Sequence, residues 1–284
     1  MSIEKETERR VPEPYLGEIF ELEVEPVIAT GFNYHEFEIA MHGVETHNGI
    51  DMDLPRGTKI LAPADGYYVA TYGEVLTRKE GLARKLSKQA LLQINPNNKD
   101  VNPPDNTNEW EIFYGSYVIQ GWHGKSRYTQ YAHIDWAVPS IPYYPPIEAI
   151  DENGNKTGDL KHSKILRAYV DEYRKPGVAV YIKAGEVIAE VGMTGCGWGK
   201  RCYDFAKFDD KGRPDFRSAD YNYYSEPHLH FVTFGRRARN TRNSTPIDPF
   251  GIYGDMNGGY PKRRSQWHIR QPNAKHEPLW LVDK

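Results

Sequence analysis

Two histidines, His228 and His230, stand two residues apart in the stretch PHLHF. Side chains of a β-strand alternate between its two faces, so a strand here places both imidazoles on one face and Leu229 and Phe231 on the other. Pro227 suits the first position of such a strand, where no ladder N–H is needed. Imidazoles that share a face can bind a metal ion or transfer protons.

A second pair, His47 and Asp51, stands four residues apart in HNGIDMDL. In a strand, and nearly so in a helix, residues at this spacing lie on one face, so both side chains can converge on an ion. Gly49 between them removes a side chain that would crowd that ion. Chance alone gives about 0.6 such His-x-x-x-Asp pairs and about 0.35 His-x-His pairs in this composition, so each pair gains meaning only from its context.

Five sequence blocks supply that context. In chain order they are HNGIDMDLPRGTKILAPADGYYV, YTQYAHI, AGEVIAEVGMTG, PHLHF and PIDPFGIY, within residues 43–253. Together they resemble the signature motifs of lysostaphin-like, or LytM-type, zinc metallopeptidases. The resemblance implies a mainly β fold, with an antiparallel β-sheet core of the duplicated hybrid motif type and helical and loop insertions that form a groove. It also implies hydrolysis of peptide bonds in the stems or cross-links of bacterial peptidoglycan.

The resemblance also assigns roles to individual residues. His47, Asp51 and His230 match the ligands of one Zn²⁺ ion, while His133 and His228 match two catalytic histidines that do not bind the metal. Two histidines and one carboxylate leave a fourth tetrahedral position for water, as in catalytic zinc sites. An imidazole nearby can accept the water's proton or hydrogen-bond the oxyanion, and the division of these roles between His133 and His228 stays open.

Two further residues are candidates for lining the substrate groove. Tyr131 alternates with His133 in YTQYAHI, which would place both on one face of a strand. His123 lies near a predicted hairpin turn. The loops that would rim the groove are longer than is usual in this family, so the bond that is cleaved cannot be carried over from it.

Two other functions compete with a zinc endopeptidase. A non-catalytic relative would bind cell wall or regulate an amidase, but such relatives typically lose metal ligands, and all five histidine and aspartate positions are intact here. Phosphocarrier proteins of sugar transport share the HxGID run but lack the YAH and PHLHF blocks. The intact positions therefore favour the enzyme.

Short strands are expected throughout the chain. Residues 57–73, 115–134 and 178–195 each predict a hairpin, and the first and third share one apolar pattern. Apolar residues at helical spacing predict helices within 77–94 and 163–177. The expected organisation is an extended lead-in (1–27), a peptidase domain (28–255) with insertions near 74–110, 136–176 and 198–226, and a C-terminal tail (256–284).

The composition limits the classes of binding partner that the chain is expected to have. The 284 residues are 39% hydrophobic with a net charge of −3, which is typical of a globular domain and does not indicate a nucleic-acid partner. The basic clusters at 235–242 and 262–264 are expected to be solvated loops. No stretch predicts a membrane span or a secretory signal, which leaves location and oligomeric state open. Cys196 and Cys202 could form a local disulfide or stay reduced.

Overall fold

The computed structural model describes residues 11–32, 47–72, 86–87, 109–110, 112–114, 116–124, 127–150, 153–161, 174–198, 206–219, 227–236, 244–254 and 259–281. Within these ranges the chain is built from strands and one short 3₁₀ helix, η5 (Arg264–Gln266). The strands are β1 Val27–Thr30, β2 Ile50–Asp53, β3 Lys59–Leu61, β4 Gly66–Tyr72, β5 Leu86–Ser87, β6 Glu109–Trp110, β7 Ile112–Tyr114, β8 Tyr117–Trp122, β9 Tyr128–Ala132, β10 Ile134–Ala137, β11 Tyr143–Tyr144, β12 Ile147–Ile150, β13 Lys156–Lys161, β14 Val180–Ile182, β15 Val187–Val191, β16 Cys196–Trp198, β17 Lys207–Phe208, β18 Pro214–Asp215, β19 His228–Arg236 and β20 Ser244–Ile247.

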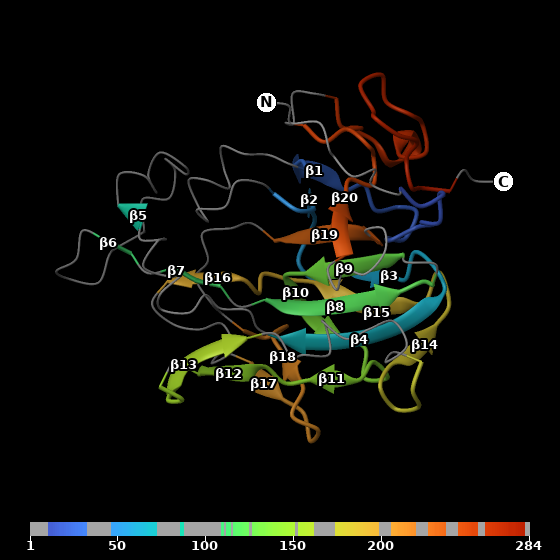
Figure 1. Cartoon of the computed structure of the whole chain (residues 1–284). Helices are drawn as coiled ribbons and strands as arrows, with labels where there is room; N and C mark the ends of the chain where they lie inside the picture. Colours follow the sequence, from blue (N-terminus) through green and yellow to red (C-terminus); the bar gives the residue numbers. More distant parts are fainter. Residues whose placement is uncertain are drawn as a thin grey trace.

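In the described part of the chain, one sheet of nine strands dominates. Its order is β1-β2-β19-β9-β8-β4-β11, with β20 paired to β19 and β14 paired to β4. Figure 1 shows this path as a stack, from β1 at the top to β11 at the bottom. The strands pair antiparallel except β11, which runs parallel to β4. The prediction of a mainly β fold with an antiparallel sheet core is confirmed.

The apolar alternation of β2 and β19 anchors the middle of this sheet. Ile50 and Met52 of β2 and Leu229 and Phe231 of β19 are completely buried. Burying side chains of this size stabilises a fold by roughly 1.5–3 kcal/mol each. The residues between them therefore face the opposite side of the sheet, as the sequence pattern predicted.

Only one of the three predicted hairpins is a hairpin. Residues 115–134 form it, because β8 and β9 pair antiparallel. The strands predicted within 57–73 and 178–195 exist, but β4 pairs with β14 in the main sheet and β3 pairs with β15 in a second sheet, β10-β15-β3. Each segment turns a corner and continues in the other sheet, so its two strands do not pair with each other.

The corners of these two segments form hydrogen bonds with each other through backbone groups. The Gly185 N–H donates to the Ala62 carbonyl and the Ala62 N–H donates to the Glu186 carbonyl, both at 2.8 Å. The Ala184 N–H donates to Asp65 Oδ1, also at 2.8 Å. The apolar pattern that the two segments share thus has a structural counterpart. Each segment forms a similar corner, and each of its strands pairs with a strand of the other segment.

The two predicted helices fall mainly outside the described residues. The helix expected within 77–94 is wrong at Leu86–Ser87, which pairs with Glu109–Trp110 as a strand. This pairing takes up the backbone hydrogen bonds there and overrides a local helical preference. Of 163–177, residues 174–177 are described and form a turn, while 163–173 lie outside. No helix in the described ranges is long and apolar enough for a membrane span.

The lead-in and the C-terminal tail pack against each other. The Leu281 N–H donates to the Leu16 carbonyl at 2.7 Å, and the Leu16 N–H donates to the Leu279 carbonyl at 2.9 Å. Arg264, expected in a solvated loop, is instead buried, and its Nε lies 2.6 Å from Glu18 Oε2. The ion pair and the carbonyls of residues 21 and 24 replace water around the guanidinium. The predicted domain and insertion boundaries stay predictions.

Candidate metal centre

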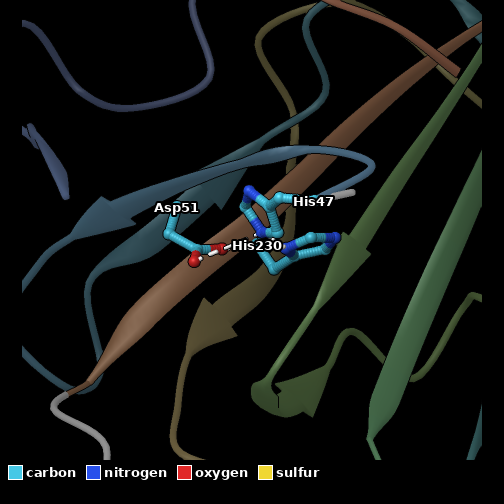
Figure 2. A group of neighbouring side chains, drawn as sticks. All are labelled: His47, Asp51 and His230. Atoms are coloured by element: carbon cyan, nitrogen blue, oxygen red, sulfur yellow. Dashed lines mark hydrogen bonds and ion pairs between the residues drawn. The ribbon is translucent and has the colours of Figure 1, made fainter. Parts of the chain in front are cut away.

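Three ligand atoms converge on the polar side of β2 and β19. The register places Asp51 directly opposite His230, and His47 lies just before β2. The His230 Nδ1 is 2.8 Å from Asp51 Oδ1, and the His47 Nε2 is 3.4 Å from Asp51 Oδ2 and 3.0 Å from His230 Nδ1. Figure 2 shows the three side chains pointing at one another. The sequence analysis predicted that these three side chains lie close together. In the fold, the register of β2 and β19 brings them together.

In each of the two imidazoles, the ring nitrogen that points away from Asp51 has its own hydrogen-bond acceptor. His47 Nδ1 donates to the Gly31 carbonyl at 2.9 Å, and His230 Nε2 donates to Asn48 Oδ1 at 3.1 Å. With a proton only on each of these nitrogens, which is the form that binds a metal ion, the lone pairs of His47 Nε2 and His230 Nδ1 and the Asp51 carboxylate would face a common point. A cation at that point removes their mutual repulsion.

The donor set suits zinc. Imidazole nitrogen and carboxylate oxygen both bind Zn²⁺ at about 2.0–2.2 Å, which separates neighbouring tetrahedral ligands by about 3.3 Å. The ligand atoms of His47, Asp51 and His230 all lie within 4.8 Å of one another. They can therefore close around one ion with small side-chain movements.

The electrostatics keep these groups in their metal-binding forms. Burial alone would raise the pKa of Asp51, but the adjacent His47 and His228 and the hydrogen bond with His230 hold that pKa well below its usual range. Burial lowers the pKa of His230, against the opposing effect of Asp51. A charged carboxylate and a neutral imidazole are the states that bind metal.

Gly49 is required by the close approach of β2 and β19. A Cβ at this position would lie 2.7 Å from the Phe231 carbonyl oxygen and 2.9 Å from Cε1 and Nε2 of His230. A side chain at this position would thus collide with the ring of His230, one of the three candidate ligands.

Gly49→Ala is expected to displace the His230 ring, to lower the free energy of unfolding by about 1–3 kcal/mol and to weaken zinc binding. Gly66→Ala is the matched control, because its Cβ would lie 2.6 Å from the Trp122 carbonyl oxygen, away from the ligands. Urea unfolding and zinc titration of both variants check this. Equal zinc affinity in the two variants would show that Gly49 has no part in seating His230.

His133 is turned towards the candidate metal ligands by its backbone. It follows β9 with a φ of 63°, in the left-handed region, which interrupts the strand alternation. Its N–H donates to Ser116 Oγ at 2.8 Å, and its Nδ1 donates to the Thr194 carbonyl at 2.5 Å. Gly195 must lack a side chain, since a Cβ would lie 2.6 Å from His133 Nδ1. Non-glycine residues with positive φ gather at functional sites.

His133 and His228 lie beside the candidate metal centre. Their ring centroids are 4.6 Å apart, His133 is 5.8 Å from the ring of His230, and His228 Nε2 is 3.9 Å from Asp51 Oδ1. Burial, together with His228 and His230, lowers the pKa of His133 well below its ordinary value. His133 is therefore neutral, with its proton on Nδ1 and an acceptor lone pair on Nε2.

No protein-family model and no curated protein matches the chain. Among solved structures, it is similar to a zinc-containing peptidase from Vibrio cholerae, with 16% identity over 84% of this chain and 39% of that one and a TM-score of 0.34. It is similar to lysostaphin from Staphylococcus simulans, with 15% identity over 88% and 58% and a TM-score of 0.35. It is also similar to Csd3 of Helicobacter pylori, with 18% identity over 86% and 34% and a TM-score of 0.33.

The chain resembles lysostaphin-like zinc peptidases. It spans less than two thirds of each of these three structures, namely 39%, 58% and 34% of their lengths. At such identities and TM-scores the matches themselves say nothing about activity.

Strand alternation gave the wrong position for Tyr131. Tyr131 is fully buried and lies on the core face, opposite Phe231 in the register and with the two ring centroids 5.4 Å apart. The expectation that it lines the groove is wrong, because the positive φ of His133 sends the two side chains to different faces.

His123 is also away from the metal ligands. Its Nδ1 donates to the Asp65 carbonyl at 3.1 Å and its Nε2 accepts from Thr129 Oγ1 at 2.8 Å. Its ring contacts Tyr15 and Tyr68, with centroids 5.6 and 5.7 Å away. Both ring nitrogens are thus used within the fold, which corrects the expectation that His123 lines the substrate groove.

The burial of His123 makes stability depend on pH. Burial lowers its pKa from 6.5 to about 4. Between these values the unfolded chain binds a proton that the folded protein does not, so the free energy of unfolding falls as the pH falls, by up to about 3 kcal/mol. His123→Gln is expected to flatten this part of the profile. Urea unfolding from pH 7 to 4 checks it, and parallel profiles for both proteins would contradict it.

Sequence reasoning missed the residues that orient the imidazoles. They are Gly31, Asn48, Ser116 and Thr194. Thr194 lies in the AGEVIAEVGMTG block and Asn48 directly follows His47, so proximity in sequence was a usable signal for these two. No sequence signal indicated the Gly31 carbonyl or the Ser116 hydroxyl, because their roles depend on contacts between segments that are distant in the chain. Cys202 lies outside the described residues, so the predicted alternatives for Cys196 and Cys202 stay open.

Proposed function

We propose that this protein is a zinc-dependent endopeptidase that hydrolyses peptide bonds in the stems or cross-links of bacterial peptidoglycan. The observation that carries the proposal is the convergence of His47 Nε2, the Asp51 carboxylate and His230 Nδ1, with two further imidazoles beside them. Three protein ligands leave a fourth position for water, which distinguishes a catalytic zinc site from a closed structural one.

The residues around the candidate ligands have different roles in the proposed peptide hydrolysis. A bound zinc ion supplies Lewis acidity, which lowers the pKa of a water and polarises the scissile carbonyl. The Nδ1–H of His133 donates a hydrogen bond to the Thr194 carbonyl, so its Nε2 can accept a proton from the attacking water and return it to the leaving amine. His228 lies against both His133 and Asp51, where it can hydrogen-bond the substrate carbonyl oxygen as negative charge develops.

The substrate class is supported by the resemblance of the five sequence blocks to lysostaphin-like zinc metallopeptidases. The identity of the cleaved bond depends on the inserted loops, which differ from those usual in the family.

Digestion of purified sacculi from several wall types, with and without a chelator, tests the proposal. Mass spectrometry is expected to find released peptides only when zinc is present, and the new termini identify the bond. His47→Ala serves as the matched inactive protein. Binding to sacculi without release of any peptide by the zinc-loaded protein would instead favour a non-catalytic wall-binding module.

A further inference from the structure

One peptide group links the candidate metal centre to the C-terminal part of the chain. The Gly31 carbonyl accepts the Nδ1 proton of His47 at 2.9 Å. The N–H of the same peptide group, which belongs to Phe32, donates to the hydroxyl oxygen of Tyr260 at 2.8 Å. Because a peptide group is planar, whatever holds the N–H also sets the direction of the carbonyl.

The Tyr260 hydroxyl is held in turn by a rigid acceptor. It donates to Asp248 Oδ2 at 2.7 Å. Asp248 is completely buried and also accepts the backbone N–H groups of Phe250, Ile252 and Tyr253 at 2.9, 3.0 and 2.8 Å. Burial raises the pKa of Tyr260, so its hydroxyl keeps the proton that it donates. Tyr260 therefore has a fixed orientation when it accepts from Phe32.

Gly31 makes this contact both possible and necessary. A Cβ at Gly31 would lie 2.5 Å from Cε2 of Tyr260, so only glycine lets the ring approach the backbone this closely. Glycine is also the residue with the greatest backbone freedom. Without Tyr260, the carbonyl that orients His47 would lose the contact that fixes its peptide plane.

We propose that Tyr260, anchored by Asp248, is a positioning residue for the metal ligand His47 and acts through the Gly31–Phe32 peptide group. The proposal rests on the zinc site of the proposed function. It gives the C-terminal tail a role in metal binding, although Tyr260 lies outside every sequence block of the resemblance. Partners that orient a metal-binding histidine typically contribute 10- to 100-fold to metal affinity.

Tyr260→Phe tests the proposal, because it keeps the ring and removes the hydroxyl. Zinc affinity, measured by chelator competition, is expected to fall by up to about 10-fold, because Tyr260 acts one contact beyond the carbonyl that orients His47. Tyr253→Phe is the matched control: its hydroxyl lies 3.1 Å from His276 Nε2, and its loss is expected to leave zinc affinity unchanged. In the zinc-free proteins, ring-nitrogen NMR is expected to show less Nδ1-protonated His47 in Tyr260→Phe than in wild type.

Unchanged zinc affinity together with an unchanged His47 tautomer in Tyr260→Phe would overturn the proposal. If this variant does not fold, Asp248→Asn replaces it. This variant keeps an oxygen acceptor but weakens the anchor, and the same two readouts apply with smaller expected changes. Absence of zinc binding in wild type would refute the proposed function instead, and the tautomer comparison in zinc-free protein would still decide the role of Tyr260.

Discussion

Replacing His230 with alanine is expected to remove the proposed zinc binding and peptidase activity together. The register places His230 opposite Asp51, and its Nδ1 lies 2.8 Å from that carboxylate. Losing a mere orienting partner of a ligand costs 10- to 100-fold in metal affinity, so losing the ligand itself is expected to cost more than about 100-fold. Metal content after dialysis, chelator competition and peptide release from sacculi measure both effects.

His268→Ala is the matched control for His230→Ala. This histidine lies near η5, far along the chain from the ligand-bearing strands, and its loss is expected to leave zinc content and turnover unchanged. If His230→Ala retained one zinc ion at wild-type affinity, the ligand assignment would be wrong. If it lost zinc but kept peptide release, hydrolysis would not depend on the metal.

Replacing His133 is expected to separate catalysis from metal binding. His133→Ala is expected to keep zinc and to lower kcat by about 10²- to 10⁴-fold, the usual contribution of a general base or acid. Its ring is 5.8 Å from that of His230, so it is a neighbour of the ligands rather than a member of the set. Zinc content and kcat, measured on the same preparation, check both parts.

His133→Asn controls for the backbone. The φ of 63° at position 133 disfavours alanine, whereas asparagine tolerates it. The asparagine variant is therefore expected to be more stable than the alanine variant and equally slow. Recovery of turnover in His133→Asn would mean that backbone strain, and not the lost imidazole, caused the defect. A fully active His133→Ala would refute its catalytic role.

Strand alternation made the cluster of His47, Asp51 and His230 predictable. His228 and His230 share a face because Leu229 and Phe231 must be buried, and Asp51 follows from the same rule in β2. The rule failed at His133, where the positive φ turns the imidazole away from the face of Tyr131. A left-handed residue leaves no trace in apolar periodicity, so the sequence could not place either side chain.

Strand positions were easier to predict than strand partners. The apolar runs in 57–73 and 178–195 are strands, but local sequence does not say whether a turn folds back or crosses to another sheet. Contacts between distant segments could not be predicted from local sequence either. Nothing near Gly31 in sequence indicates that Tyr260, more than two hundred residues later, holds its peptide group.

The pairing of Asp51 with His230 joins residues that are 179 positions apart in the chain. An ion between them would close that long loop in the middle of the sheet, where β2 and β19 adjoin. A ligand that binds only the folded state adds about 4 kcal/mol at a thousand times its dissociation constant. The chelator that stops hydrolysis is therefore expected to shorten survival against proteases too, so one ion would set both the catalytic rate and the lifetime of the folded chain.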